Sequence, residues 1–115
     1  MTAETTQYDS RQYFRVQYPT ALRPRLHVNG ESLPVIDISE RGLRLVNPRR
    51  SSDGAIEPQV AATLRFRDGV TTPIRGKIVR VTERDIALHL ETGLSYQLIV
   101  REQRALMGQL RYALV

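Results

Sequence analysis

Short runs in which apolar and polar residues alternate, separated by turn-forming residues, fill the middle of this 115-residue chain. A period of two places successive side chains on opposite faces of a β-strand. Leu26 and Val28 alternate with polar neighbours, and Asn29-Gly30 then supplies a strong signal for a two-residue hairpin turn. Several short strands joined in this way predict a small antiparallel barrel or sandwich.

Six strands are expected between Arg25 and Leu90, with a loop rich in Pro, Ser, Asp and Gly at residues 47–58. Asp68-Gly69 is expected to turn the chain between the fourth and fifth strands. The fifth strand is long, and Pro73 and Gly76 predict a bend or bulge within it. The expected strands are residues 25–28, 33–38, 42–46, 60–66, 70–81 and 86–90.

The two ends of the chain differ from the middle. Residues 93–112 contain no Pro, and apolar residues recur there near helical spacing, with Ser95 as a suitable N-cap. We therefore expect a C-terminal helix that packs on the barrel or contacts a partner. Residues 1–10 are expected to be disordered, and 11–24 to form an extended arm within a single domain of residues 11–115. The apolar helix positions are Ile99, Leu106, Leu110 and Leu114.

Composition limits the class of protein. Hydrophobic residues make up 41% and charged residues 25%, as in ordinary globular domains. No apolar run is long enough to span a bilayer, and the polar residues 1–10 lack the apolar stretch of a signal peptide, so a cytoplasmic location is expected. The absence of Cys excludes disulfides and thiolate metal sites. A net charge of +5 fits either an anionic partner or a solvated basic surface.

Two short motifs carry the functional information. Arg11 and Arg15 place two guanidinium groups four residues apart, and Asp37, Ser39 and Gly42 follow in the order Asp-x-Ser-x-x-Gly. Arginine binds phosphate in a bidentate manner and also pairs with the O6/N7 edge of guanine. A carboxylate accepts hydrogen bonds from the guanine N1 and N2 groups, and glycine permits close approach to the backbone.

In this order and separation the two motifs resemble those of the PilZ domain family, whose members bind the bacterial second messenger cyclic di-GMP. The family pattern is Arg-x-x-x-Arg, a gap of a couple of dozen residues, then Asp or Asn-x-Ser-x-x-Gly, and both halves match here without substitution. The likeness covers most of residues 11–92. It implies a six-stranded antiparallel barrel followed by a helix. It also implies an N-terminal arm that folds over the ligand, so that Arg11 and Arg15 clasp guanine and phosphate.

Strand alternation predicts how the second motif is presented. Ile36 and Ile38 are expected to point into the barrel, which leaves Asp37 exposed on the outside to accept from a guanine edge. Ser39 is expected to donate to the ligand or to hold the turn. Gly42 is expected to satisfy a steric need or to have a positive φ. The expected outward patch consists of Asp37, Ser39, Gly42 and Arg44.

Two further side chains, Arg44 and Arg80, are weaker candidates for the same site. Arg44 belongs to the outward patch. Arg80 lies on the long fifth strand, where its guanidinium could stack on a guanine face. Tyr13 and Phe14, between the two arm arginines, are expected to anchor the arm on the barrel or to stack on a base.

The sequence offers few parts for an enzyme. His27 and His89 fall in different strands, with no carboxylate at metal-ligand spacing. No nucleophile has an evident base. We therefore expect no catalytic residue, no metal and no cofactor.

Two alternatives to the cyclic di-GMP receptor stay open. One is a PilZ-like interaction domain without nucleotide binding, and the other is a small basic barrel that binds nucleic acid. A receptor would signal to a downstream protein, in pathways such as motility or exopolysaccharide synthesis.

Overall fold

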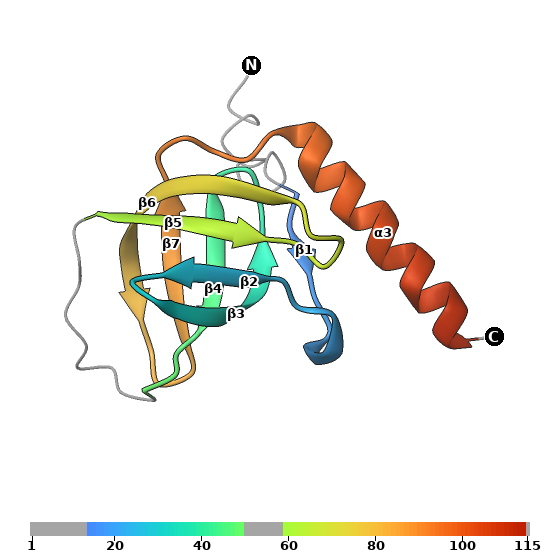
Figure 1. The fold of residues 1–115 in the computed structure, drawn as a ribbon, viewed down its shortest axis with the longest axis horizontal. Helices are drawn as coiled ribbons and strands as arrows, with labels where there is room; N and C mark the ends of the chain where they lie inside the picture. The colour runs from blue at the N-terminus through green and yellow to red at the C-terminus, as the bar shows by residue number, and fades with distance from the viewer. Residues whose placement is uncertain (1–13, 50–58, 115) are drawn as a thin grey trace, which may run out of the picture.

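The fold is mainly β, with six antiparallel strands closed into a barrel and one C-terminal helix (Figure 1). The computed structural model describes residues 14–49 and 59–114, with side chains up to Gln109. The strands follow one another around the ring in the order β3-β2-β5-β6-β7-β4, and pairing of β3 with β4 closes it. The predicted barrel is therefore confirmed. Its strands are β2 (Arg25–Val28), β3 (Glu31–Ile38), β4 (Gly42–Val46), β5 (Val60–Arg65), β6 (Thr71–Val81) and β7 (Asp85–Leu90).

The hairpin turns form where the sequence places turn residues. Asn29 and Gly30 both have positive φ, at 50° and 79°, which is the type I′ arrangement that matches the twist of the flanking strands. Gly69 has a φ of 90°, and the Val70 N–H donates to the Asp68 carboxylate at 3.0 Å. These local contacts fix the registers of the β2–β3 and β5–β6 pairs.

The long strand β6 differs from the prediction in the place of its irregularity. Pro73 pairs with Thr63 of β5 without a break in the register. The missing N–H of Pro73 does not disturb the other side of the strand, because β7 pairs with β6 only from Gly76 onward. At Gly76, an added Cβ would lie 2.4 Å from the His89 carbonyl oxygen, so glycine allows close strand approach. The register shift instead falls between Ile78 and Arg80.

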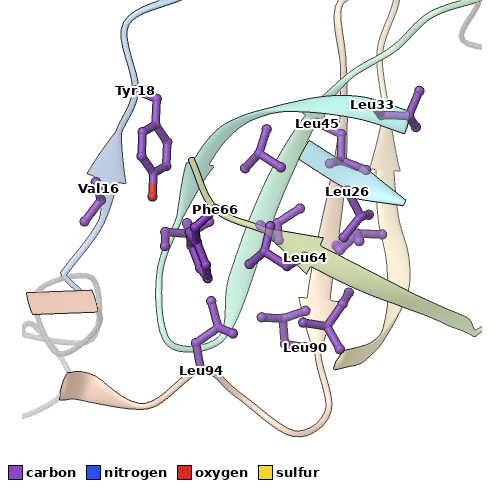
Figure 2. Close-up of a cluster of buried hydrophobic side chains, with 14 of the residues drawn as sticks. Val16, Tyr18, Leu26, Leu33, Leu45, Leu64, Phe66, Leu90 and Leu94 are labelled. Carbon is purple, nitrogen blue, oxygen red and sulfur yellow. The ribbon is translucent and has the colours of Figure 1, made fainter. Parts of the chain in front are cut away.

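The barrel interior is filled by aliphatic side chains from every strand of the ring, together with Phe66 (Figure 2). Leu26, Val35, Ile38, Leu64 and Leu90 have no exposed surface. Burying such side chains contributes roughly 1.5–3 kcal/mol each and is the main force that holds the barrel closed. The outer faces of the same strands carry the polar and charged residues.

The segment before the barrel is partly built into the fold. Residues 14–24 contain strand β1 (Val16–Gln17), which pairs antiparallel with β3, and the 3-10 helix η1 (Thr20–Leu22). Val16 and Tyr18 are buried in the core cluster (Figure 2). The segment predicted as an extended arm is therefore anchored to the barrel from Val16 onward, by two apolar side chains at alternate positions.

Helix α3 (Tyr96–Leu114) lies beside the barrel, against β1 (Figure 1). The Ser95 hydroxyl accepts from the Leu98 N–H at 3.1 Å, which confirms the predicted N-cap. Ile99 is fully buried, and Leu106 packs against the core as a partly buried residue. The predicted apolar face is confirmed at these two positions, and the side chains of Leu110 and Leu114 lie outside the described residues.

Candidate ligand-binding site

The turn between β3 and β4 brings the residues of the second motif together. The Ser39 N–H donates to the Gly42 carbonyl at 2.9 Å, and the Ser39 hydroxyl lies 3.5 Å from the same oxygen. Asp37 and Arg44 are register partners across the two strands, so both side chains leave the sheet on the same face. Ser39 is 1% exposed, which fits a role in holding the turn.

Strand β1 brings the first motif to this turn. Val16 pairs with Ile38 and Gln17 with Asp37, so Arg15 emerges at the end of β3. Its guanidinium donates through Nη1 to Oδ1 of Asp37. Arg15 and Asp37 are thus joined in space although the sequence separates them by 22 residues. Arg11 and Tyr13 lie outside the described residues, and their roles stay predictions.

The Asp37 carboxylate is held by two arginines. Arg15 occupies Oδ1, and Arg44 contacts Oδ2 through Nε and Nη2, both at 2.7 Å. The Asp37 side chain has 0% exposure. Asp37 does face outward, but the prediction that it is exposed there is wrong, because the guanidinium groups of Arg15 and Arg44 cover it. A buried carboxylate needs such partners, since an unpaired charge carries a large desolvation cost.

The inward pattern of β3 also differs from strict alternation. Val35 and Ile38 are fully buried, whereas Ile36 is half-buried and does not belong to the core cluster. The register with β4 shifts between Val35 and Asp37, and a bulge of this kind breaks the period of two. The prediction that Ile36 points into the barrel is therefore wrong.

Gly42 has a steric role that involves the two motifs rather than its own backbone angle. Its φ lies outside the left-handed region, so the alternative explanation by a positive φ does not apply. A Cβ at this position would lie 3.2 Å from Arg15 Nη2 and 3.3 Å from the Ser39 hydroxyl oxygen. The missing side chain leaves the space in which the Arg15 guanidinium sits beside the turn.

Arg44 extends the ion pair into a chain of alternating charges. Its Nη1 donates to Asp85 Oδ2 at 3.0 Å, and Arg80 Nη2 lies 3.8 Å from the same oxygen. The hydrogen bond to Asp37 and the nearby charges of Asp37 and Asp85 raise the pKa of Arg44 above its usual value, despite partial burial. Thr82 donates its hydroxyl to Asp85 Oδ1 at 2.8 Å and fixes that carboxylate.

The two motifs and Arg44 lie beside an open cavity of about 990 Å³ on the outside of the barrel, which we call the Arg15 cavity. This volume is at the upper end of the range typical of small-molecule sites. Arg15, Arg41, Arg44 and Arg80 line it, against one lining carboxylate, so the cavity favours an anion. Phe14 and Val79, which are 47% and 57% exposed, add apolar surface. The remaining lining residues are Gln17, Asp37, Ser39, Gly42, Leu43, Ala87, Leu88 and His89.

Sequence reasoning missed several members of this site. Asp85, Arg41, Val79 and His89 were not among the predicted ligand-binding residues. Nothing local distinguishes Asp85 from an ordinary turn-forming aspartate. Its contact with Arg44 depends on the pairing of β4 with β7, which places Val46 opposite Asp85. The register shift between Ile78 and Arg80 likewise leaves Val79 and Arg80 both exposed at the cavity.

The cavity is connected to α3 from two directions. Beyond Arg15, the hydroxyl of Tyr18 donates to Glu102 Oε1 in α3 at 2.6 Å, in a buried hydrogen bond. In the β3–β4 turn, the Glu40 carbonyl accepts a hydrogen bond from the Leu94 N–H at 2.8 Å. Strand β1 and the β3–β4 turn therefore each contact the helix or the segment that leads to it.

Two other kinds of site were sought in the part of the chain that the structure describes. No group of three or more His, Cys, Asp or Glu side chains there is arranged to hold a metal ion. No helix there is long and apolar enough to cross a membrane.

Comparison with known proteins decides the family. The family model described as PilZ domain matches residues 9–113. The chain belongs to the PilZ domain family. PilZ domains generally act as receptors or adaptors for cyclic di-GMP and are typically non-enzymatic binding domains.

A solved structure supports the fold of this PilZ domain. The crystal structure of an uncharacterized protein from Legionella superimposes with a TM-score of 0.58 at 16% sequence identity, over 81% of this chain and 96% of that one. At this identity the likeness concerns the fold alone. No curated protein matches the chain.

Proposed function

We propose that this PilZ domain is a non-enzymatic receptor that binds cyclic di-GMP in the Arg15 cavity. The observation that carries the proposal is the convergence of Arg15 with Asp37, Ser39 and Gly42, from two distant segments, on one wall of a basic cavity. Cyclic di-GMP carries two phosphodiester charges and two guanine rings. The cavity offers arginine groups for the phosphates and guanine edges, and apolar side chains beside them.

Arg15 is the principal ligand contact in this proposal. Asp37 holds Nη1 of its guanidinium, while the Arg15 side chain remains 42% exposed and keeps N–H groups for the ligand. An anchored guanidinium loses less conformational entropy on binding than a free one, which favours affinity. Arg11, four residues earlier in the motif, is proposed as the second clasping arginine.

Asp37 is proposed to act mainly through Arg15. A guanine edge reaches the Asp37 oxygens only if Arg15 or Arg44 first moves away, because both oxygens are occupied and the side chain is buried. Breaking such a charge-assisted hydrogen bond costs about 1.5–3 kcal/mol. Ser39 and Gly42 keep the turn in the conformation that leaves room for the anchored Arg15.

The other cavity residues complete the proposed ligand contacts. Arg80 is 56% exposed and forms only a long ion pair with Asp85, so its guanidinium is available to a phosphate or a guanine face. Arg44 has its N–H groups directed at Asp37 and Asp85, and is therefore proposed to position the site rather than to grip the ligand. Phe14 and Val79 supply surface against which a purine can pack.

The signal is proposed to pass to a downstream protein. Ligand contact with Arg15 acts on a residue adjacent to β1, which is hydrogen-bonded through Tyr18 to α3. A ligand shifts such an equilibrium only by its differential affinity for the two arrangements. The conformational change is proposed to involve the residues before Val16, since Val16 and Tyr18 are already buried in the core.

Calorimetric titration of the purified protein with cyclic di-GMP tests this function, with GTP and cyclic di-AMP as matched nucleotide controls. We expect micromolar or tighter binding of cyclic di-GMP, about −8 kcal/mol, and much weaker binding of the two controls. Equal affinity for all three nucleotides would indicate a general anion site. No binding of any of them would leave an interaction domain without a nucleotide ligand.

A further inference from the structure

A second cationic surface lies on the outer face of β2, β5 and β6, and it borders the Arg15 cavity only at Lys77, the register partner of His89. We call it the basic face and define its charged residues as Arg25, Arg65, Arg75 and Lys77. All four are exposed, and they alternate along their strands with buried or half-buried residues, so they point outward together. Among the described outward-facing residues from Arg25 to Val28, Val60 to Arg65 and Thr71 to Lys77, none is a carboxylate, and the exposed Glu91 borders the face, where its N–H donates to the Arg75 carbonyl at 2.8 Å.

The charged side chains of the basic face lack the carboxylate partners that Arg15 and Arg44 have at the cavity. None of the four takes part in an ion pair with another described residue. Arg25 and Arg65 are direct register partners on adjacent strands, and like charges in this position destabilise a sheet. Arg25 reduces the conflict by donating to Ser32, at 3.0 Å to the hydroxyl and 2.8 Å to the carbonyl. The arrangement works against stability, which points to a role in binding.

The layout of the face is that of a protein interface. Arg75 lies opposite Ala61, four residues along β5 from Arg65, which separates the two charged ends by about 13 Å. Between them lie Thr63 and its two register partners, Pro73 and His27, none of which is Arg, Lys, Asp or Glu. An uncharged centre between charged margins is typical of protein–protein contacts.

Other polyanions fit this face less well. It presents no Phe, Tyr or Trp side chain and only the imidazole of His27, whereas binding of single-stranded nucleic acid relies on several aromatic stacking platforms. It also lacks large apolar side chains that would insert into a lipid surface. We propose that the basic face docks an acidic patch on the surface of a partner protein.

The location of the basic face allows docking and ligand binding at the same time. The strand at its centre, β5, is three strands away from β4 in either direction around the six-stranded ring, so the centre of the face lies opposite the cavity wall at Gly42. Strands β2 and β5 cross in front of β4 and β7 in Figure 1. Because the inference uses no residue of the cavity, it stands whether or not cyclic di-GMP binds.

A polyglutamate peptide serves as the acidic probe, titrated into the isotopically labelled protein without nucleotide and followed by backbone amide NMR shifts. Oligothymidylate and phosphatidylglycerol vesicles are titrated in parallel. We expect polyglutamate shifts to concentrate on β2, β5 and β6. Stronger binding of oligothymidylate or of vesicles at this face would overturn the assignment in favour of nucleic acid or membrane.

Charge reversal separates this site from a general effect of net charge. Arg65→Glu and Arg75→Glu should together weaken polyglutamate binding about tenfold or more, or about 1.4 kcal/mol. The matched control is a pair of reversals on the exposed residues Arg84 and Arg104, Arg84→Glu with Arg104→Glu, which should weaken it less than about threefold. Equal losses in the two double variants would contradict a docking site.

The single substitution Arg65→Glu tests whether the Arg25–Arg65 pair destabilises the fold. Arg65→Glu places a carboxylate opposite Arg25 and replaces a like-charge pair by an opposite-charge pair. Its thermal unfolding midpoint should therefore rise, while polyglutamate binding falls. A lower midpoint would overturn the argument that the Arg25–Arg65 pair works against stability.

Discussion

The Arg15 guanidinium donates to Oδ1 of Asp37, a fully buried carboxylate at the end of β3. This contact joins the two sequence motifs and orients an arginine at the mouth of a basic cavity. It also gives Asp37 a specific task, which is to hold an arginine in place.

A double-mutant cycle measures whether Arg15 and Asp37 contribute to cyclic di-GMP binding together or independently. Arg15→Ala should weaken cyclic di-GMP binding about hundredfold, near 2.7 kcal/mol, because it removes the principal contact. Asp37→Ala should weaken it by a smaller amount, and the double variant should bind no more weakly than Arg15→Ala alone. Calorimetry on the four proteins gives the coupling energy.

Additive losses in that cycle would contradict the anchoring role, since Asp37 would then contact the ligand independently of Arg15. Circular dichroism must show that each variant is folded. Loss of Arg15 leaves Asp37 with Arg44 as its cationic partner, and should cost about 1–3 kcal/mol of unfolding free energy.

Gly42→Ala tests the steric role of the glycine. The new methyl group would lie 3.2 Å from Arg15 Nη2 and 3.3 Å from the Ser39 hydroxyl oxygen, and the flexible arginine is the group that can move. We therefore expect cyclic di-GMP affinity to fall about tenfold, or 1.4 kcal/mol, with a small change in thermal unfolding midpoint.

Gly108→Ala is the matched control, because no described group outside the neighbouring backbone of α3 lies within 4 Å of its Cβ position. It should leave affinity unchanged and stabilise the helix by up to about 1 kcal/mol. If Gly42→Ala lowers the unfolding midpoint strongly and leaves affinity intact, the glycine serves the fold rather than Arg15.

Asp85→Asn tests the chain of charges behind Asp37. The substitution weakens the interactions of Arg44 and Arg80 with this side chain, and should lower the free energy of unfolding by about 1–2 kcal/mol. Asp68→Asn is the control, because Asp68 is 55% exposed and its ion pair with Arg101 contributes about 0–1 kcal/mol. Urea unfolding of both variants compares them, and equal effects would show that the Arg44–Asp85 contact is no stronger than a surface pair.

Tyr18 predicts a dependence of stability on alkaline pH. Burial and the hydrogen bond to Glu102 raise the pKa of Tyr18 far above its usual value near 10. The phenol of the unfolded chain ionises first as pH rises, so this contribution to stability is complete below pH 10 and is lost progressively above it. The free energy of unfolding, measured in urea, should therefore fall above pH 10.

Tyr18→Phe should remove the part of the fall in unfolding free energy above pH 10 that is due to the Tyr18 phenol. At neutral pH it should lower the free energy of unfolding by about 1–2 kcal/mol, because Glu102 loses its buried hydrogen-bond donor. The control is Tyr96→Phe, at a position that is 60% exposed. An identical alkaline profile for the wild type and Tyr18→Phe would show that the Tyr18 phenol ionises freely in the folded protein.

Much of the fold can be predicted from local patterns. Asn29 and Gly30 fix a hairpin because few residues tolerate two positive φ values in succession, and Ser95 starts a helix because its hydroxyl can accept a backbone N–H. Alternation then marks the six barrel strands.

What the sequence could not predict depends on contacts between distant segments. The burial of Asp37 requires Arg15 and Arg44 to meet it, and the exposure of Val79 requires a bulge that only the β6–β7 pairing reveals. The short strand β1 carries only two residues, too few for a period to be recognised. The site residues were thus predictable by resemblance, but their mutual contacts were not.

Mapping of cyclic di-GMP by backbone amide NMR shifts tests the central claim most directly. On titration into the labelled protein, we expect the largest shifts at Ser39, Gly42 and Arg44 on the cavity wall, with smaller shifts following in α3 through Tyr18 and Glu102. The same titration of Arg15→Ala should show these shifts only at much higher nucleotide concentration. Shifts confined to the basic face of β2, β5 and β6, or a pattern unchanged by Arg15→Ala, would contradict binding in the Arg15 cavity.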